Sequence, residues 1–173
     1  MKKNVVILTA EGFQDEEYLY CYYRTTEEGI IPDVCTPTGK SVIGKYGVPT
    51  KGFHISVENL SVHKYDAVLI PGGFEAPGRL RHLVEVTNFI KSMHEFNKPI
   101  GAICHGPQVL ISADIVKGKK ITSYKDVYVD LQNAGAIALY MEPVIVDGNI
   151  VTSSHYDFNG PFMKAFIELL NSQ

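Results

Sequence analysis

The run Ala-Ile-Cys-His-Gly at 102–106 has the composition of a site for nucleophilic chemistry. Cys104 follows a short apolar run, precedes a helical pattern, and has small residues two positions to either side. This is the pattern of a nucleophile elbow, a tight turn that admits only small flanking side chains. A helix N-terminus lowers a thiol pKa, so we expect the pKa of Cys104 to fall below about 7. The adjacent His105 would act as its base or ion-pair partner.

The alternative is a small buried cysteine beside a surface histidine, which describes most Cys-His dipeptides. The strand, turn and helix pattern around Cys104 favours the reactive interpretation. Pro71-Gly72-Gly73 ends another predicted strand, and ligand sites in open α/β sheets form at the carboxyl ends of strands. The backbone amides of Gly73 and His105 could then form an oxyanion hole, although a tight turn that only needs glycine would look the same.

Three acidic residues, Asp15, Glu16 and Glu17, open the first predicted helix. Acidic residues in a first turn usually complement the helix dipole on a solvated face. Because this helix follows a buried strand, one carboxylate could instead point over the strand ends toward Cys104, and the pattern does not choose among the three. His155 follows a late strand and could overhang the same edge. The histidines show no HxxH or HxxxH spacing, so we expect no metal.

The elements that must position these residues alternate between strand-like and helix-like patterns, which predicts an α/β sheet with helices on both faces. The glycine-rich stretch 38–55 suggests a β-hairpin, and Asp147-Gly148-Asn149 predicts a second one. The predicted strands are 4–9, 33–36, 67–70, 99–103, 120–123, 144–146 and 150–152, and the predicted helices are 15–29, 79–97, 104–113, 126–134 and 161–171.

The 173 residues, 45% apolar and 20% charged with a net charge of −3, predict one domain over 1–173. Clustered Lys and Arg are absent, which excludes a nucleic-acid footprint, and no apolar run approaches the roughly 20 residues of a membrane span. The apolar run after Lys2-Lys3 ends too early for an export signal, so we expect a cytoplasmic protein.

Three cysteines without CxxC spacing argue against a disulfide framework. Cys21 and Cys35 lack a neighbouring base and are expected in the core. The tyrosines at 18, 20, 22 and 23 crowd one helix, which suggests packing or an oligomer contact rather than a cofactor site.

Together these motifs resemble the PfpI/ThiJ superfamily, in particular its PfpI-like intracellular protease and deglycase branch. The resemblance covers nearly the whole chain. The matching stretches are Leu8-Thr9-Ala10 with Asp15-Glu16-Glu17, then Asp66-Ala67-Val68-Leu69-Ile70-Pro71-Gly72-Gly73, then Lys98-Pro99-Ile100-Gly101-Ala102-Ile103-Cys104-His105-Gly106-Pro107-Gln108, then Asn133-Ala134-Gly135 and Val146-Asp147-Gly148-Asn149.

The resemblance implies a flavodoxin-like three-layer sandwich with a mostly parallel sheet, related to glutamine amidotransferase domains. It places the carboxylate near the sulfur at Glu17 and the oxyanion donors at Gly73 and His105, with no cofactor. It also implies a homo-oligomer, a dimer or a hexamer with active sites at subunit contacts. Reported family activities are peptidase, deglycase, glyoxalase and chaperone-like stress protection.

Two loops depart from the family pattern. Peptidase-like members carry a Glu after Ala-Pro, supplied by a neighbouring subunit, whereas Gly78 follows Ala76-Pro77 here and the nearest acid, Glu75, precedes that pair. Where family members carry an Arg followed by Pro, this chain reads His155-Tyr156-Asp157. Both departures weaken the transfer of peptidase activity more than that of the nucleophile.

The leading hypothesis is therefore a cytoplasmic cysteine-dependent hydrolase or lyase acting on dicarbonyls or on glycated amines and thiols. The second is a peptidase in which Glu75, His155 or Asp157 walls the site, with one of the acids orienting His105. The third is a redox sensor or chaperone without turnover, in which Cys104 is oxidised.

Overall fold

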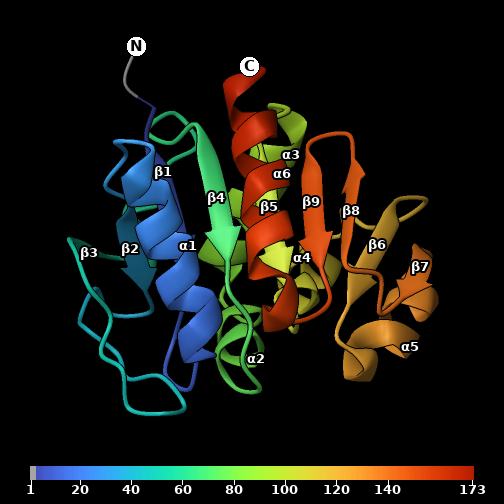
Figure 1. The fold of residues 1–173 in the computed structure, drawn as a ribbon, viewed down its shortest axis with the longest axis horizontal. Helices are drawn as coiled ribbons and strands as arrows, with labels where there is room; N and C mark the ends of the chain where they lie inside the picture. The colour runs from blue at the N-terminus through green and yellow to red at the C-terminus, as the bar shows by residue number, and fades with distance from the viewer. Residues whose placement is uncertain (1–2) are drawn as a thin grey trace.

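The computed structural model describes residues 3–173, so Met1 and Lys2 of the predicted N-terminal segment lie outside it. A seven-stranded sheet has the order β3-β2-β1-β4-β5-β9-β8, and β6 and β7 form a separate pair (Figure 1). The strands are β1 (Val5–Leu8), β2 (Asp33–Thr36), β3 (His54–Ser56), β4 (Ala67–Ile70), β5 (Ile100–Ile103), β6 (Lys120–Ser123), β7 (Ile137–Tyr140), β8 (Val144–Asp147) and β9 (Ile150–Ser153). Every pair is parallel except β8 with β9.

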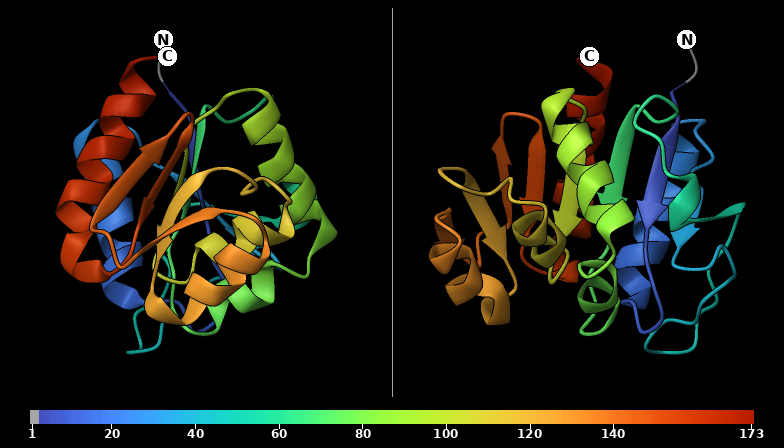
Figure 2. Two further views of the ribbon diagram at one scale, coloured as in Figure 1. Left: turned by 90° about the vertical axis from the view of Figure 1, so that its right-hand side faces the viewer. Right: turned by 180° about the vertical axis from the view of Figure 1, so that it is seen from behind.

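Helices cover both faces of this sheet, as the alternating pattern predicted. Helices α1 and α6 lie together on one face, while α3 and α4 lie on the other (Figures 1 and 2). The helices are α1 (Asp15–Glu27), α2 (Ala76–Leu80), α3 (Val84–Glu95), α4 (Pro107–Ser112), α5 (Tyr128–Asn133) and α6 (Asn159–Asn171), with single 3₁₀ turns at Val57–Asn59, Lys125–Val127 and Tyr156–Phe158. The predicted α/β sandwich with a mostly parallel sheet is confirmed.

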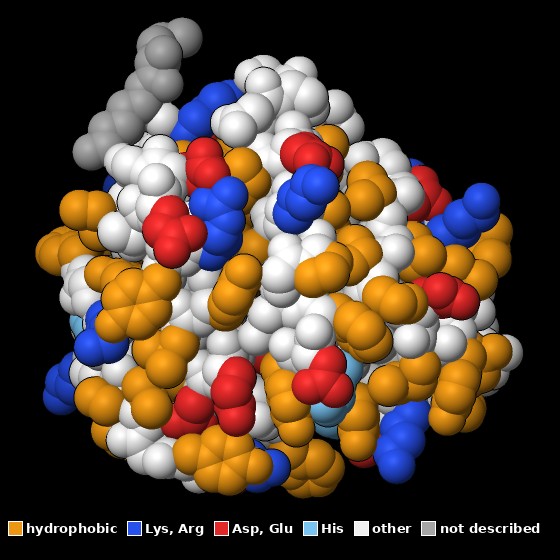
Figure 3. Space-filling model, viewed as in Figure 1, with side chains coloured by type: hydrophobic (Ala, Val, Ile, Leu, Met, Phe, Trp, Pro, Cys, Tyr) orange, Lys and Arg blue, Asp and Glu red, His pale blue; other side chains and the backbone are white. Residues whose placement is uncertain are grey.

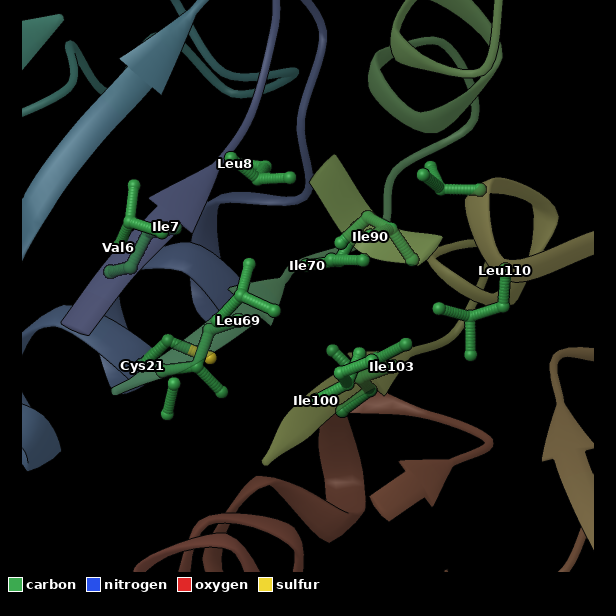
Figure 4. Packing of buried hydrophobic residues seen from close by; sticks show 14 of the residues in the cluster. Val6, Ile7, Leu8, Cys21, Leu69, Ile70, Ile90, Ile100, Ile103 and Leu110 are labelled. Atoms are coloured by element: carbon green, nitrogen blue, oxygen red, sulfur yellow. The ribbon is translucent and has the colours of Figure 1, made fainter. Parts of the chain in front are cut away.

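The central strands are apolar because both of their faces are covered. All residues of β1, β4 and β5 are buried, and their Val, Ile and Leu side chains form the core with the inner faces of the helices (Figure 4). Cys21 of α1 and Cys35 of β2 are fully buried in this core, as expected.

The strand order reverses beside β1, and this reversal places the candidate site. From β1 the chain proceeds to β2 and β3 on one side, then returns to β4 and continues to β5 and β9 on the other. The connections leaving the carboxyl ends of β1, β4 and β5 therefore meet at one edge, the lower edge in Figure 1. Ligands in open α/β sheets bind at such a switch point.

The β-hairpin predicted over 38–55 is present only as a short irregular antiparallel turn, in which the Gly44 N–H donates to the Val48 carbonyl (2.8 Å) and the Thr50 N–H donates to the Val42 carbonyl (2.9 Å). Only two isolated antiparallel bridges occur in this stretch, Thr38 with Ser56 and Ile43 with Pro49, and β3 pairs with β2 in parallel. One side chain from the start of α1 holds two further amides of this loop, since Asp15 accepts hydrogen bonds from the backbone N–H of Tyr46 (2.9 Å) and Val48 (3.0 Å). These bonds fix the loop beside the site.

Two further elements differ from the sequence prediction. The helix predicted over 79–97 is divided into α2 and α3 by a turn at 81–83, and β7 was not predicted. Strand β7 reads Ile-Ala-Leu-Tyr, but it is half-exposed and pairs with β6 at the end of the molecule, beside α5 (Figure 2). Among residues 3–173, no helix is long and apolar enough to cross a membrane.

Candidate active site

Cys104 lies at the turn between β5 and α4 in a left-handed backbone conformation, with φ of 61°. Its N–H donates to the Ser153 carbonyl (2.9 Å), and its own carbonyl accepts from the N–H of Tyr124 (2.9 Å). A Cβ at Gly106 would collide with the carbonyl oxygens of Ile70 and Ile103, which explains the small residue there. The structure therefore gives the 102–106 run the strained geometry of a nucleophile elbow.

Two backbone amides, those of Gly73 and His105, act on the Cys104 thiol and lower its pKa. Gly73 has φ of 99°, and a Cβ there would lie 2.5 Å from the backbone nitrogen of Gln14, so only glycine fits. These are the two amides that the sequence analysis proposed as oxyanion donors, and in the structure both are close enough to influence the thiol.

Glu17 is the carboxylate that the structure brings to Cys104. It is fully buried, and the N–H of Gly72 donates to its Oε2 at 2.6 Å. A Cβ on Gly72 would lie 2.8 Å from the Cys104 Cβ, from Glu17 Oε2 and from the His105 nitrogen, so the bare glycine lets the three groups meet. Asp15 instead accepts hydrogen bonds from backbone amides of the adjacent loop, and Glu16 accepts one from the side chain of Gln14.

Burial controls the protonation of this pair. It raises the pKa of Glu17 to about 8, against a smaller lowering by the Gly72 N–H, so the carboxyl is protonated at neutral pH. Burial is also the largest effect on Cys104, and it raises the pKa of the thiol. The Glu17 charge raises that pKa further, whereas the amides of Gly73 and His105 lower it. The expected fall of the Cys104 pKa is thus wrong in direction, because desolvation outweighs the helix N-terminus.

His105 is placed to take the thiol proton. Its Nδ1 lies 3.2 Å from the Cys104 sulfur, and the side chain is almost fully buried. Burial lowers the pKa of His105, the nearby Asp126 raises it, and Lys45 lowers it. The imidazole is therefore neutral at neutral pH and can accept a proton.

Asp126 is the acid nearest to His105, and the sequence did not point to it. Its Oδ2 lies 3.7 Å from His105 Nε2, a buried nitrogen with no hydrogen-bond partner among residues 3–173. Asp126 belongs to the 3₁₀ turn after β6, far along the chain from the Cys104 run. The neighbouring Tyr124, whose N–H donates to the Cys104 carbonyl, also connects that turn to the elbow.

The other predicted residues lie elsewhere around the site. Glu75 pairs with Arg79 (2.6 Å), and Asp157 lies 3.1 Å from His155, so within the described part of the chain neither acid pairs with His105. His155 does line the pocket, where the Tyr124 ring lies between it and His105.

The sulfur opens into a pocket of about 240 Å³, which we name the Cys104 pocket. It is lined by Gln14, Lys45, Tyr46, Gly73, Phe74, Cys104, His105, Tyr124, Asp126, His155 and Tyr156. Lys45 and Tyr46 come from the loop that Asp15 anchors and were not predicted. Within residues 3–173, no cluster of three His, Cys, Asp or Glu side chains is arranged to hold a metal ion.

Glu17→Gln is expected to change the pH dependence of Cys104 alkylation by iodoacetamide. Above about pH 8 the native carboxyl is ionised and its charge opposes the thiolate, whereas glutamine stays neutral. The variant should therefore be alkylated several-fold faster than the wild type at pH 9, and at a similar rate at pH 6.5. Slower alkylation of the variant at pH 9 would contradict this assignment.

Asp126→Asn is expected to lower the kcat/KM of a Cys104-dependent reaction by about tenfold, because protonated His105 loses a carboxylate 3.7 Å from its Nε2 that stabilises the positive charge. The Asp126 charge raises the pKa of His105, so its removal should also move the acid limb of the pH profile to lower pH. Glu75→Gln serves as the matched control. An unchanged acid limb in Asp126→Asn would show that this carboxylate does not act on His105.

Comparison with known proteins shows which family the chain resembles in sequence and fold. The model of the DJ-1/PfpI family matches residues 3–169. Deglycase TK1284 of Thermococcus kodakarensis is 39% identical over 166 residues, covering 96% of this chain and 98% of the relative. Protein/nucleic acid deglycase 2 of Escherichia coli is 34% identical over 175 residues, covering 99% and 100%.

Among solved structures, Drosophila melanogaster DJ-1beta superposes with a TM-score of 0.89 at 26% identity, over 98% of this chain and 91% of that one. A relative from Bacillus subtilis named "Putative cysteine protease YraA" is 39% identical over 171 residues, covering 98% of this chain and 99% of the relative. Together with the deglycase names, it bears out the prediction of an enzyme of the cysteine hydrolase type. By sequence and by fold, the chain belongs to the DJ-1/PfpI family.

Proposed function

We propose that this protein is a cysteine-dependent hydrolase or lyase that acts on small dicarbonyl compounds and on their adducts with amines and thiols. The observation that carries the proposal is the 3.2 Å contact between the Cys104 sulfur and His105 Nδ1. A thiol beside a neutral imidazole, faced by two backbone N–H groups, is the arrangement that nucleophilic attack on a carbonyl carbon needs. The deglycase names of the relatives support the same chemistry.

The first step transfers the Cys104 proton to His105 Nδ1 while the sulfur attacks the aldehyde carbon. The carbon–sulfur bond forms and the carbonyl electron pair moves to oxygen, where the amides of Gly73 and His105 stabilise the charge. Protonation by the neutral Glu17 carboxyl then gives a hemithioacetal. With an amine adduct, the sulfur displaces the amine, which leaves with a proton from His105.

The second step moves a hydrogen between the two carbons. The hemithioacetal carbon loses a proton to a base and the neighbouring ketone carbon gains one, which yields a thioester of a 2-hydroxy acid. Glu17 and His105 are the groups available for both transfers. Water then hydrolyses the thioester, releasing the acid and restoring the thiol. The Cys104 pocket, about 240 Å³, favours a substrate of this small size.

A peptidase is the second candidate. It is favoured by the arrangement in which His105 lies between the Cys104 sulfur and the Asp126 carboxylate. The order of nucleophile, base and acid is that of a catalytic triad, although Asp126 Oδ2 stands 3.7 Å from the imidazole. Hydrolysis of fluorogenic peptides that is lost in both Cys104→Ala and Asp126→Asn would support this activity. Absence of peptide cleavage by the wild type at high enzyme concentration would refute the peptidase function.

We also propose a cytoplasmic setting. It is supported by the free state of all three cysteines in the described chain, which suits a reducing compartment.

A homo-oligomer is proposed as well. Figure 3 shows hydrophobic side chains spread over the face that carries α1 and α6. On α1, Tyr20 and Tyr23 are 39% and 49% exposed. Exposed tyrosines are enriched at subunit interfaces.

The oligomer proposal predicts that Tyr23→Glu lowers the mass in solution toward the 19.2 kDa of one chain. A charge placed in this contact opposes association, whereas Lys91→Glu at an exposed position of α3, on the opposite face of the sheet, should leave the mass unchanged. Light scattering after gel filtration measures both. Equal masses for the wild type and Tyr23→Glu would show that α1 is not the contact.

The central prediction is that Cys104→Ala lowers methylglyoxal consumption by on the order of 10³-fold or more, because no nucleophile remains. Cys21→Ala removes a buried thiol outside the site and serves as the matched control. Product 2-hydroxy acid is measured directly, and circular dichroism verifies folding. Undiminished consumption by Cys104→Ala would overturn the proposed function.

A further inference from the structure

A second cavity adjoins the Cys104 pocket. It measures about 550 Å³, and we name it the Arg81 cavity. Its lining residues are Phe74, Gly78, Arg81, His82, His105, Gln108, Ser112 and Asp126. Phe74, His105 and Asp126 line both spaces, so the Arg81 cavity and the Cys104 pocket adjoin along these three side chains.

Arg81 gives this cavity a cationic group with free donors. Its Nε donates to Ser112 Oγ at 2.9 Å, which fixes the side chain, and among residues 3–173 it has no acidic partner. Its two terminal nitrogens are left for a ligand, in the planar fork that binds a carboxylate through two hydrogen bonds. The neighbouring Arg79, in contrast, is neutralised by Glu75 at 2.6 Å.

Acceptors lie on the side of the cavity near His105. The Gln108 side-chain oxygen is buried and has no hydrogen-bond partner in the described chain, and the Asp126 carboxylate is half-exposed. A buried acceptor without a donor costs free energy, which a ligand N–H would recover. An amine therefore suits the His105 side of the cavity, and a carboxylate suits the Arg81 side.

We propose that the Arg81 cavity holds the leaving amine of the substrate and selects amines that carry a carboxylate, of which free α-amino acids are the simplest. This inference rests on the proposed function. Cys104 forms its bond to the dicarbonyl-derived carbon, and the bond from that carbon to nitrogen breaks. The nitrogen, taking a proton from His105, leaves within the cavity while Arg81 holds its carboxylate.

Kinetics with a matched substrate pair test the selection. Methylglyoxal adducts of glycine and of glycinamide differ only in the carboxylate, and we expect the wild type to use the glycine adduct with at least tenfold higher kcat/KM. In Arg81→Met this ratio should fall to about one, whereas Arg79→Met should keep it. A wild-type ratio near one, or a ratio unchanged by Arg81→Met, would overturn the proposal.

A binding measurement separates this proposal from the proposed function. In Cys104→Ala, which cannot turn over, titration calorimetry should show N-formylglycine binding at least tenfold more tightly than N-formylglycinamide, with the difference lost on adding Arg81→Met. Selective binding of N-formylglycine together with no turnover by the wild type would support carboxylate binding in the Arg81 cavity and would refute the proposed function. Normal dicarbonyl turnover without selective binding would refute the proposed role of the Arg81 cavity and leave the proposed function intact.

One more outcome would count against the cavity. If Arg81→Met changes the oligomer mass and lowers the activity on both adducts equally, the cavity is a subunit contact and the proposal fails.

Discussion

The burial of Glu17 against the Gly72 N–H is the interaction on which the rest of the site depends. An ionised carboxylate in such a place would lose its hydration and gain only one backbone hydrogen bond in return. The neutral acid is therefore the stable form at neutral pH, with a pKa raised to about 8. A neutral Glu17 removes a charge that would oppose the thiolate and places a proton beside the sulfur, ready for the oxygen that develops on the substrate.

The backbone around the contact between Glu17 and Gly72 is also constrained sterically. Gly72 has no side chain because three neighbours occupy the space where a Cβ would stand, and Cys104 adopts a left-handed conformation between β5 and α4. Such strain persists only where the surroundings determine it, and here the hydrogen bonds to Ser153 and Tyr124 do so. The bond to Tyr124 also holds the turn that carries Asp126, which couples the nucleophile to the acid beside its base.

The sequence predicted the features that a local pattern of residues determines. Buried apolar runs identified the central strands, and the small residues around Cys104 identified the elbow. For Glu17, the resemblance supplied the choice that the pattern of three acids left open, and burial in the structure explains it. The hairpin over 38–55 is only partly formed because some of its amides bond to Asp15 rather than to the opposite strand, which no local pattern reveals.

The residues that were missed share one property: tertiary contacts alone bring them to the site. Asp126, Lys45 and Arg81 stand on a 3₁₀ turn, a loop and a helix end that carry no motif. The Cys104 pKa was misjudged for a related reason. A helix N-terminus can be read from sequence, whereas the desolvation that opposes it depends on how completely the chain folds over the sulfur.

The protonation state of Glu17 tests this account most directly. An infrared difference spectrum between the wild type and Glu17→Gln at pH 7 isolates the vibrations of that one carboxyl group. The account predicts the carbonyl stretch of a neutral carboxylic acid, which converts to carboxylate bands as the pH rises through about 8. Carboxylate bands alone at pH 7 would show that Glu17 is ionised beside Cys104 and would contradict it.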